Sequence, residues 1–215
     1  LVDSYDISAD KITPAHNGIT QTPPDELPDV LQRWKQRGNK IILFLGRQTI
    51  QKGPDYFLQA AKKLMSIRQD VRFVMAGSGD MQEELIEQAA ALGIGDRVLF
   101  PGFVRGEKTD RLYQSSDLYV LSSVSEPFGI TPLESLLNRT PVLISKQSGV
   151  SEVVTHALKT DFWDIDDMAA KMDAALRYPA LADELRRNGF QQAQSLSWTK
   201  TAQTCQDCYN KLVNQ

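Results

Sequence analysis

The sequence predicts a doubly wound α/β domain, in which a parallel sheet is buried between two layers of helices. Short apolar runs alternate with longer segments of helical periodicity between residues 41 and 145. The runs are continuously apolar, which is typical of strands buried on both faces of a parallel sheet. With 215 residues, 41% of them hydrophobic, the chain is long enough for one large domain with a substantial core.

The expected elements follow one another in a regular order. Strands are predicted at residues 41–46, 71–76, 98–103, 118–122 and 142–145. Apolar side chains at helical spacing predict helices at residues 54–67, 81–92, 110–115 and 132–138, and a short helical piece at residues 29–37. After Asp164 the pattern is wholly helical, at residues 168–178, 181–194 and 198–213. Residues 1–28 are typical of a loop-like lead-in, broken by Pro14, Pro23, Pro24 and Pro28.

Composition excludes several classes of protein. The formal net charge is −3, and no basic stripe is available for a nucleic-acid backbone. No apolar stretch approaches the roughly 18 to 20 residues that cross a bilayer, and no charged-then-apolar leader begins the chain, so we expect a soluble, cytoplasmic protein with no evident membrane association. The only histidines are His16 and His156, so we expect no metal site.

Two cysteines, Cys205 and Cys208, form a Cys-x-x-Cys pair, a pattern that elsewhere marks redox or metal sites. Here both lie in an amphipathic stretch, with no second pair and no preceding strand of the thioredoxin type. We therefore favour an ordinary position on a helix.

The most informative segment reads Ser-Glu-Pro-Phe-Gly-Ile-Thr-Pro-Leu-Glu and ends at Glu134. It joins a buried strand to a helix, with Thr131 as the predicted cap, Pro132 in the first turn and Glu134 as a capping-box acid. Such turns bind ligands in open α/β sheets, because unpaired amides at the helix start point outward. The segment can offer amides to anionic oxygen, and Glu126 and Glu134 to sugar hydroxyls. Alternatively, Glu134 only caps its helix and Glu126 is only a solvated loop residue.

A second loop follows the first strand and carries two cations. Gly46 and Arg47 end the strand, and Lys52 and Gly53 precede Pro54, which opens a helix. Arginine offers a bidentate fork and lysine a compact charge, a pairing that suits a diphosphate. Alternatively, Arg47 and Lys52 are two solvated bases among the 24 in the chain.

Two further turns follow the second and third strands. Residues 77–80 read Gly-Ser-Gly-Asp, but a dinucleotide-binding fingerprint should follow the first strand and contain a third glycine, which argues against a nicotinamide cofactor. Phe103 and Val104 come at the end of the third strand. This apolar pair either covers a nucleobase or packs within its own loop.

In combination these motifs resemble the C-terminal, donor-binding domain of retaining GT-B glycosyltransferases of the glycosyl transferases group 1 family. That family includes glycogen synthases, sucrose synthases and lipopolysaccharide glycosyltransferases. The resemblance covers nearly the whole chain, and it implies a Rossmann-like doubly wound sheet with a C-terminal helical tail. The sequence departs from the family pattern after Gly149, where residues 157–166 lack the usual Asp-Gly-x-x-Gly turn.

The resemblance implies a role for each motif. Arg47 and Lys52 would neutralise the donor diphosphate, Glu126 would approach the donor sugar, and Glu134 would bind the ribose hydroxyls. We expect further donor contacts from Gly46, Gly77, Phe103, Val104, Phe128, Gly129 and Ile130. Neither a cofactor nor a metal is implied.

The implied reaction is transfer of a hexose, with glucose favoured, from a nucleoside diphosphate sugar to a hydroxyl of a glycan or lipid-linked acceptor, with retention at the anomeric carbon. Glucan is one such acceptor. The alternatives are a non-catalytic nucleotide-sugar binding module and a nucleotide-sugar epimerase of the same architecture.

The resemblance also bears on domain organisation. Asn17, Gly18 and Ile19 resemble the crossover from an N-terminal domain, and residues 195–213 resemble the helix that packs back against that domain. We therefore expect an acceptor-binding domain to precede Leu1, and we expect the isolated chain to bind donor without transferring it.

Overall fold

The computed structural model describes residues 2–5, 7–19 and 29–213. The chain forms two compact units. The larger unit spans residues 21–193 and contains the sheet, and the smaller unit combines residues 1–20 with residues 194–215.

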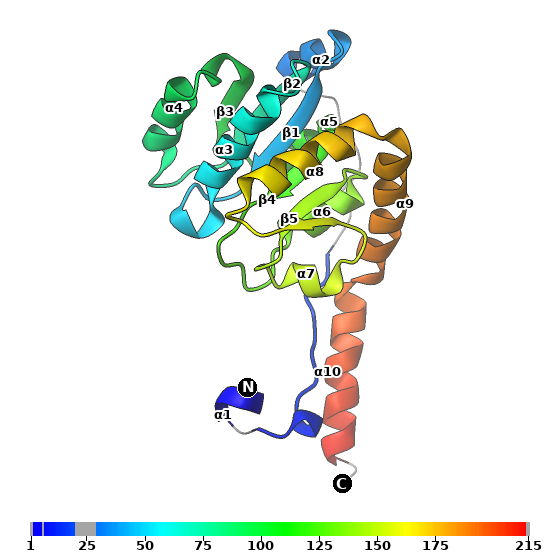
Figure 1. The fold of residues 1–215 in the computed structure, drawn as a ribbon. Helices are drawn as coiled ribbons and strands as arrows, with labels where there is room; N and C mark the ends of the chain where they lie inside the picture. Colours follow the sequence, from blue (N-terminus) through cyan, green and yellow to red (C-terminus); the bar gives the residue numbers. More distant parts are fainter. Residues whose placement is uncertain (1, 6, 20–28, 214–215) are drawn as a thin grey trace. The chain divides into compact units, whose positions relative to one another are not determined.

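The larger unit is built on a six-stranded parallel sheet with the order β3-β2-β1-β4-β5-β6 (Figure 1). The strands are β1 (Lys40–Leu45), β2 (Val71–Ala76), β3 (Val98–Gly102), β4 (Leu118–Leu121), β5 (Val142–Ser145) and β6 (Leu158–Thr160). The chain winds outward from β1 to β3 and then returns to the other side of β1, so the direction of winding reverses between β1 and β4. The predicted doubly wound fold is confirmed.

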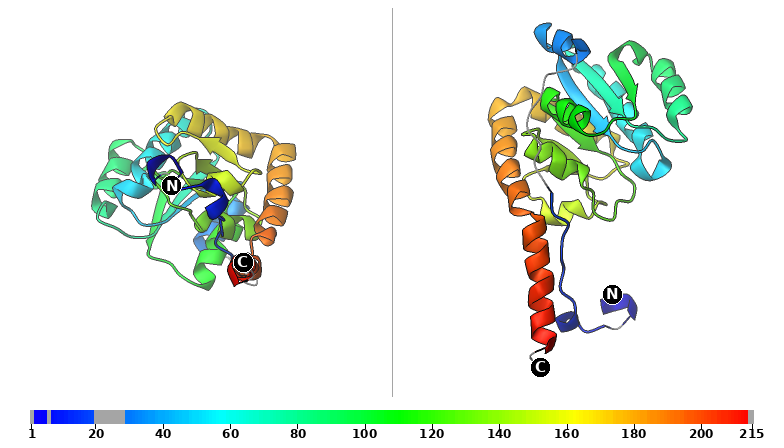
Figure 2. Two further views of the ribbon diagram at one scale, coloured as in Figure 1. Left: turned by 90° about the horizontal axis from the view of Figure 1, so that it is seen from below. Right: turned by 180° about the vertical axis from the view of Figure 1, so that it is seen from behind.

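Helices cover both faces of this sheet, as the opposite views in Figures 1 and 2 show. One face carries α3 (Pro54–Met65), α4 (Gln82–Ala91) and α8 (Ile165–Arg177), and α3 packs against both of the others. The other face carries α5 (Glu107–Ser115) and α6 (Thr131–Leu137), which pack against each other. The unit also contains α2 (Asp29–Gln36), α7 (Val150–Val153) and most of α9 (Pro179–Ser195).

The core beneath α3 is built from aromatic rings. The Phe57 ring centroid of α3 lies 5.7 Å from that of Phe44 on β1 and 6.0 Å from that of Phe73 on β2. Met168 and Met172 of α8 complete this buried layer. Because the central strands are buried on both faces, they appear in the sequence as unbroken apolar runs, which is why they could be located there.

The sequence does not predict α7 or β6. Strand β6 contains three residues, Leu158, Lys159 and Thr160, of which only the first is apolar. It pairs with β5 at the edge of the sheet, in parallel register from Leu143 and Leu158 to Ser145 and Thr160. A strand this short and polar carries no apolar run, so its position depends on pairing with β5.

In the smaller unit, α10 (Trp198–Val213) confirms the final helix predicted from the sequence. The Ile19 amide donates to the Leu196 carbonyl oxygen over 3.1 Å. A Cβ at Gly18 would lie 2.0 Å from the Trp198 nitrogen, so only glycine fits there. The helix also carries Cys205 and Cys208, neither of which forms a disulfide.

The lead-in expected for residues 1–28 is described in part. It contains α1 (Val2–Tyr5) and a short 3-10 helix (Ala9–Lys11), whereas Pro23, Pro24 and Pro28 lie outside the described residues. Among the helices described, none is long and apolar enough to cross a membrane.

We expect Gly77→Ala to destabilise the larger unit by at least about 3 kcal/mol. An added Cβ would lie 1.9 Å from the Gly46 carbonyl oxygen, at a φ of +123°. Gly38 is the control, since its φ is +76° but no atom lies within 4 Å of an added Cβ, so Gly38→Ala should cost only about 1 kcal/mol. Urea denaturation of the two variants measures the difference. Equal losses of unfolding free energy in the two variants would show that the backbone contact at Gly77 is not rigid.

Candidate functional site

A cavity of about 190 Å³ lies at the carboxyl ends of β1 and β4. The winding of the sheet reverses there, so the loops after these two strands run in opposite directions and leave room for a ligand. The lining residues come from both strands, the loop after β1 and the start of α6: Phe44, Leu45, Gly46, Arg47, Lys52, Leu121 and Thr131. The cavity therefore brings together Gly46, Arg47 and Lys52, all of which the sequence singled out.

The loop after β1 is fixed against the loop after β2. The Gln48 side chain is buried, and its amide group donates to the Gly77 carbonyl oxygen over 3.3 Å. The Gln48 backbone amide donates to the Ser78 carbonyl oxygen over 3.0 Å. Arg47 is left exposed at the sheet edge, with its Nη2 3.4 Å from the Gln51 Oε1 atom. Its guanidinium is thus accessible to a ligand.

The central contact of the site is an ion pair between Lys52 and Glu126, which come from the loops after β1 and β4. The Lys52 side chain is 17% exposed and the Glu126 side chain 11% exposed. Each side chain is thus mostly shielded from solvent and pairs with a counter-ion, and removing one partner would leave the other charge uncompensated, which costs stability. The two alternatives raised above, a solvated base at Lys52 and a solvated carboxylate at Glu126, are therefore wrong.

Backbone contacts hold these two loops together around the ion pair. Gly53 has a φ of +58°, and an added Cβ would lie 2.3 Å from the Ser122 carbonyl oxygen. The Ser122 hydroxyl donates to the Gly53 carbonyl oxygen over 2.7 Å, and the Val124 amide donates to the Gln51 carbonyl oxygen over 3.0 Å. Lys52 is therefore positioned both by its own loop and by the loop that carries its partner.

A third loop, after β5, fixes the backbone of Glu126. Glu126 and Ser148 form an isolated parallel bridge, and the Gly149 amide donates to the Glu126 carbonyl oxygen over 2.9 Å. A Cβ at Gly149 would lie 2.1 Å from the Pro127 carbonyl oxygen. Glycine at this position lets the two backbones approach.

The helix after Glu126 begins at Thr131, and the predicted capping box is wrong. Ile130 occupies the N-cap position, and no side chain caps the helix. The Thr131 hydroxyl instead accepts a hydrogen bond from the Tyr119 hydroxyl over 2.8 Å. Within the described part of the chain, the amides of Gly129 and Ile130 donate to no protein acceptor. They are available to an anionic oxygen.

Glu134 lies in the first turn of α6, where its carboxylate accepts a hydrogen bond from the Tyr113 hydroxyl over 3.0 Å. Burial raises the pKa of Glu134 above its ordinary value; the Tyr113 hydrogen bond opposes this rise, and the Asp110 carboxylate adds to it. Burial also raises the pKa of Tyr113 well above its ordinary value, so its hydroxyl stays protonated at neutral pH. Glu134 is thus a partly desolvated carboxylate with one fixed donor.

Phe103 and Val104 line a different cavity, of about 320 Å³, against α2 and α5. The Phe103 side chain is 66% exposed, and the Arg105 guanidinium carbon lies 5.4 Å from its ring centroid. The other lining residues are Val30, Leu31, Leu99, Pro101, Lys108, Arg111 and Leu112. The structure therefore does not bring this pair into the cavity of Arg47 and Lys52.

Several residues of the site, among them Tyr119, are not singled out by the sequence, and Thr131 is predicted only as a helix cap. Tyr119 is buried on β4, and its hydroxyl lies 2.8 Å from Thr131 Oγ1 and 3.2 Å from the Leu45 carbonyl oxygen. A tyrosine inside an otherwise aliphatic strand was the available signal, since a buried hydroxyl needs a partner. For Gln48 and Ser122, nothing local in the sequence indicates their contacts with other loops.

No group of three or more His, Cys, Asp or Glu side chains that could hold a metal ion is found in the described ranges.

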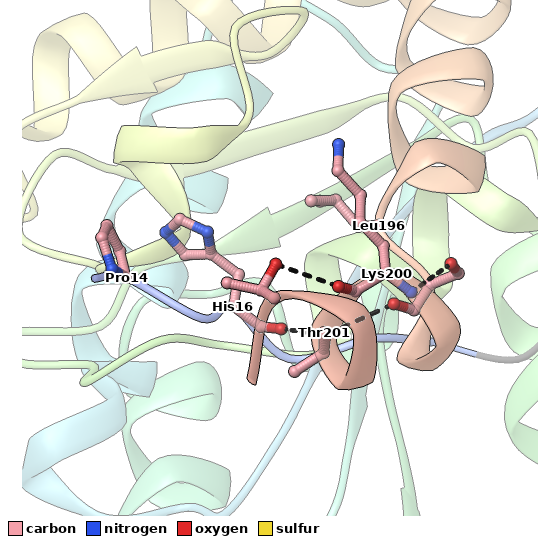
Figure 3. Close-up of a pocket in the computed structure, with 7 residues that line it drawn as sticks. Pro14, His16, Leu196, Lys200 and Thr201 are labelled. Atoms are coloured by element: carbon pink, nitrogen blue, oxygen red, sulfur yellow. Dashed lines mark hydrogen bonds between the residues drawn. The ribbon is translucent and has the colours of Figure 1, made fainter. Parts of the chain in front are cut away.

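The smaller unit has a cavity of its own, of about 140 Å³, which Figure 3 shows in close-up. Pro14 and His16 line one side, and Lys200 and Thr201 of α10 line the other. The Thr201 hydroxyl donates to the His16 carbonyl oxygen across it. The remaining lining residues are Leu196, Ser197 and Thr204. None of the candidate site residues lies in this cavity, whose contacts tie residues 14–16 to α10.

Together, the fold and the first cavity define an open α/β domain with a cavity that carries two cations, Arg47 and Lys52, at its topological switch point. The model of the family described as glycosyl transferases group 1 matches residues 31–192, and the chain belongs to that family. An uncharacterised glycosyltransferase of Methanocaldococcus jannaschii is 37% identical over 163 residues, which is 71% of this chain and 40% of that protein. Mannosylfructose-phosphate synthase of Agrobacterium fabrum is 32% identical over 186 residues, 81% of this chain and 41% of that protein.

The fold is also found in solved structures. HepE of Anabaena, in its crystal structure with UDP-glucose, matches with a TM-score of 0.74 and 21% identity over 86% of this chain and 54% of that chain. This likeness confirms the Rossmann-like, GT-B type of sheet expected from the sequence. The chain spans about 40% of the length of the two curated relatives.

We expect Glu134→Gln to be at least as stable as the wild type at neutral pH. The pKa of Glu134 is raised in the folded state, so the folded protein binds this proton more tightly than the unfolded chain does. The wild type should therefore lose stability as the pH rises above about 4.3 and through the raised pKa. Glutamine keeps an acceptor for Tyr113 but cannot ionise.

Urea denaturation across this pH range measures the difference between Glu134→Gln and the wild type. The stability of the variant should depend less on pH. A variant that is less stable than the wild type at neutral pH would show that the surroundings of Glu134 favour its charged form.

Proposed function

We propose that this chain is the donor-binding part of a retaining glycosyltransferase. It binds a nucleoside diphosphate sugar, with NDP-glucose favoured, and presents the hexose to a hydroxyl of a glycan or lipid-linked acceptor, such as a glucan, in the cytoplasm. The observation that carries the proposal is the partly buried Lys52–Glu126 ion pair at the cavity at the switch point. Membership of the glycosyl transferases group 1 family supports the chemistry.

The leaving group in this reaction is the nucleoside diphosphate. When the bond between the anomeric carbon and the phosphate oxygen breaks, negative charge collects on that oxygen. Arg47 and Lys52 line one cavity, so both cations can face it. The amides of Phe128, Gly129 and Ile130 would point the positive N–H ends of their dipoles at the same oxygen. Charges placed in advance stabilise the transition state more than the ground state, because little reorganisation is needed when the new charge appears.

Lys52 and Glu126 would act on neighbouring parts of the donor. The Lys52 ammonium has three N–H donors, so it can contact a phosphate oxygen and still hold Glu126. The Glu126 carboxylate, fixed through its backbone to the loop after β5, would accept hydrogen bonds from the donor sugar. Glu126 is thus the acid nearest the chemistry in this proposal.

The nucleoside would lie along the same edge of the sheet. Glu134 would accept hydrogen bonds from the ribose hydroxyls, since an ionised carboxylate accepts more bonds than the single one that Tyr113 donates. Phe103 and Val104 would cover the nucleobase at the end of β3. Gly46 and Gly77 would let the donor approach the backbone closely. The solved complex of HepE with UDP-glucose supports uridine as the base.

We also propose that the smaller unit joins this domain to an acceptor-binding domain. Residues 17–19 would be the crossover and residues 195–213 the returning helix. Three apolar side chains of α10, those of Tyr209, Leu212 and Val213, are at least 68% exposed, as expected of a helix whose partner surface belongs to another domain.

Calorimetric titration of the chain with UDP, ADP and GDP should show binding of at least one of them. Lys52→Ala removes the phosphate cation and Glu134→Ala the ribose acceptor, so each should weaken binding by about tenfold or more. Lys63→Ala is the control, because this lysine of α3 is half exposed and pairs with Asp166 at the surface. Unchanged affinity in both site variants would sink the assignment.

In the full-length protein, Arg47→Ala should lower kcat about 10²- to 10³-fold, because it removes a cation from the departing diphosphate. Its melting temperature should stay unchanged, since Arg47 is exposed. A wild-type protein that binds nucleotide tightly but neither transfers nor hydrolyses the donor would instead be a binding module. Release of an inverted sugar without any acceptor would identify an epimerase.

A further inference from the structure

An aromatic patch lies outside the cavity described above. It consists of Tyr56, Phe162 and Trp163. The Tyr56 and Phe162 ring centroids are 5.1 Å apart, and those of Phe162 and Trp163 are 4.8 Å apart, both in edge-to-face geometry. The Trp163 side chain is 57% exposed. A large ring is therefore held in place from beneath while much of its surface faces solvent.

The backbone that carries Phe162 and Trp163 is fixed as well. It forms the turn between β6 and α8, and Asp164 caps α8 by accepting from the Asp167 amide over 2.9 Å. The Ile165 amide donates to the Trp163 carbonyl oxygen over 3.1 Å, and the Phe162 amide lies 3.4 Å from the Gln147 Oε1 atom. The indole is thus presented by a turn with its own hydrogen bonds, which lowers the entropy cost of binding to it.

Planar polar groups accompany the patch. The two oxygens of the Asp161 carboxylate accept from Lys146 Nζ and from Gln147 Nε2, each over 2.8 Å. The hydrogen bonds from Lys146 and Gln147 hold the pKa of Asp161 below its ordinary value, so it is ionised at neutral pH. Asp161, Asp164 and Asp167 all act electrostatically on Lys146, so the surface beside Trp163 is polar and acidic.

The patch is continuous with the loop that carries Lys52. Tyr56 lies in the first turn of α3, and its Cδ2 atom would be 3.0 Å from a Cβ added at Gly53. Tyr56 belongs to α3, and Phe162 and Trp163 directly precede α8. These two helices lie side by side on one face of the sheet (Figures 1 and 2). Phe162 and Trp163 follow the carboxyl end of β6, so they lie at the same edge of the sheet as the cavity of Arg47 and Lys52.

We propose that this patch is a saccharide-binding subsite on the donor domain, which holds a neutral sugar residue of the acceptor glycan. One face of a pyranose ring carries only C–H groups and packs on an exposed indole, while its hydroxyls need planar donors and acceptors of the kind that Gln147 and Asp161 supply. The carboxylates of Asp161 and Asp164, on either side of Phe162 and Trp163 in the sequence, disfavour a polyanion or an anionic lipid. The inference rests on the proposed glycosyl transfer and implies an acceptor of more than one sugar residue.

The test uses the whole chain, labelled with ¹⁵N, and three probes: maltohexaose, cellohexaose and mannohexaose. At millimolar concentrations, at least one should shift the indole N–H resonance of Trp163 and leave that of Trp34 in place. Trp163→Ala should weaken this binding about tenfold, equivalent to about 1.4 kcal/mol, and Trp163→Phe should weaken it less. Tyr178→Ala is the matched control, because Tyr178 is also 57% exposed but lies at the end of α8.

Three outcomes would overturn the proposal. The first is that none of the three oligosaccharides shifts the Trp163 resonance, and the second is that Trp163→Ala binds them as well as the wild type. The third is that the Trp163 resonance shifts with protein concentration alone, which would make a second copy of the chain the occupant. UDP titration of the same variants separates this inference from the proposed function. Trp163→Ala should bind UDP as the wild type does. If the wild type itself does not bind UDP, the proposed function is refuted, and the subsite, which rests on it, falls too.

Discussion

The site depends on one interaction, the ion pair between the partly buried charges of Lys52 and Glu126. Their residues are 74 positions apart in the sequence and belong to loops that follow different strands. Leaving either charge without its partner in this partly buried position would cost stability. The ion pair therefore favours contact between the loop after β1 and the loop after β4. That meeting places the cavity and its two cations at the switch point of the sheet.

Glycines allow these loops to approach one another at four places. At Gly53, Gly77, Gly79 and Gly149, an added Cβ would lie within 2.3 Å of a carbonyl oxygen from another loop. In each case two backbones are in contact where a side chain would keep them apart. The four loops after β1, β2, β4 and β5 are thus joined into one edge. A ligand bound at this edge would meet groups that are already positioned, so little of its binding energy would be lost to ordering them.

The sequence predicts the central sheet well because buried runs of residues without charge, 41–44 in β1 and 118–121 in β4, mark its central strands. It cannot predict β6, because Lys159 and Thr160 take strand geometry only through their pairing with β5. It identifies Lys52 and Glu126 by residue type and loop position, but their direct contact is a tertiary fact that local patterns do not contain. The capping box fails for a related reason, since Thr131 is engaged by Tyr119 from β4 rather than by its own helix.

The central claim is that the ion pair marks the binding site of the donor diphosphate. It is tested most directly by a crystal structure of the chain with the nucleoside diphosphate that binds most tightly. We predict phosphate oxygens at the carboxyl ends of β1 and β4, within hydrogen-bonding distance of Lys52 Nζ, with the Glu126 carboxylate beside the terminal phosphate, where the sugar would be attached. A nucleotide bound elsewhere, with Lys52 contacting only Glu126, would contradict the account.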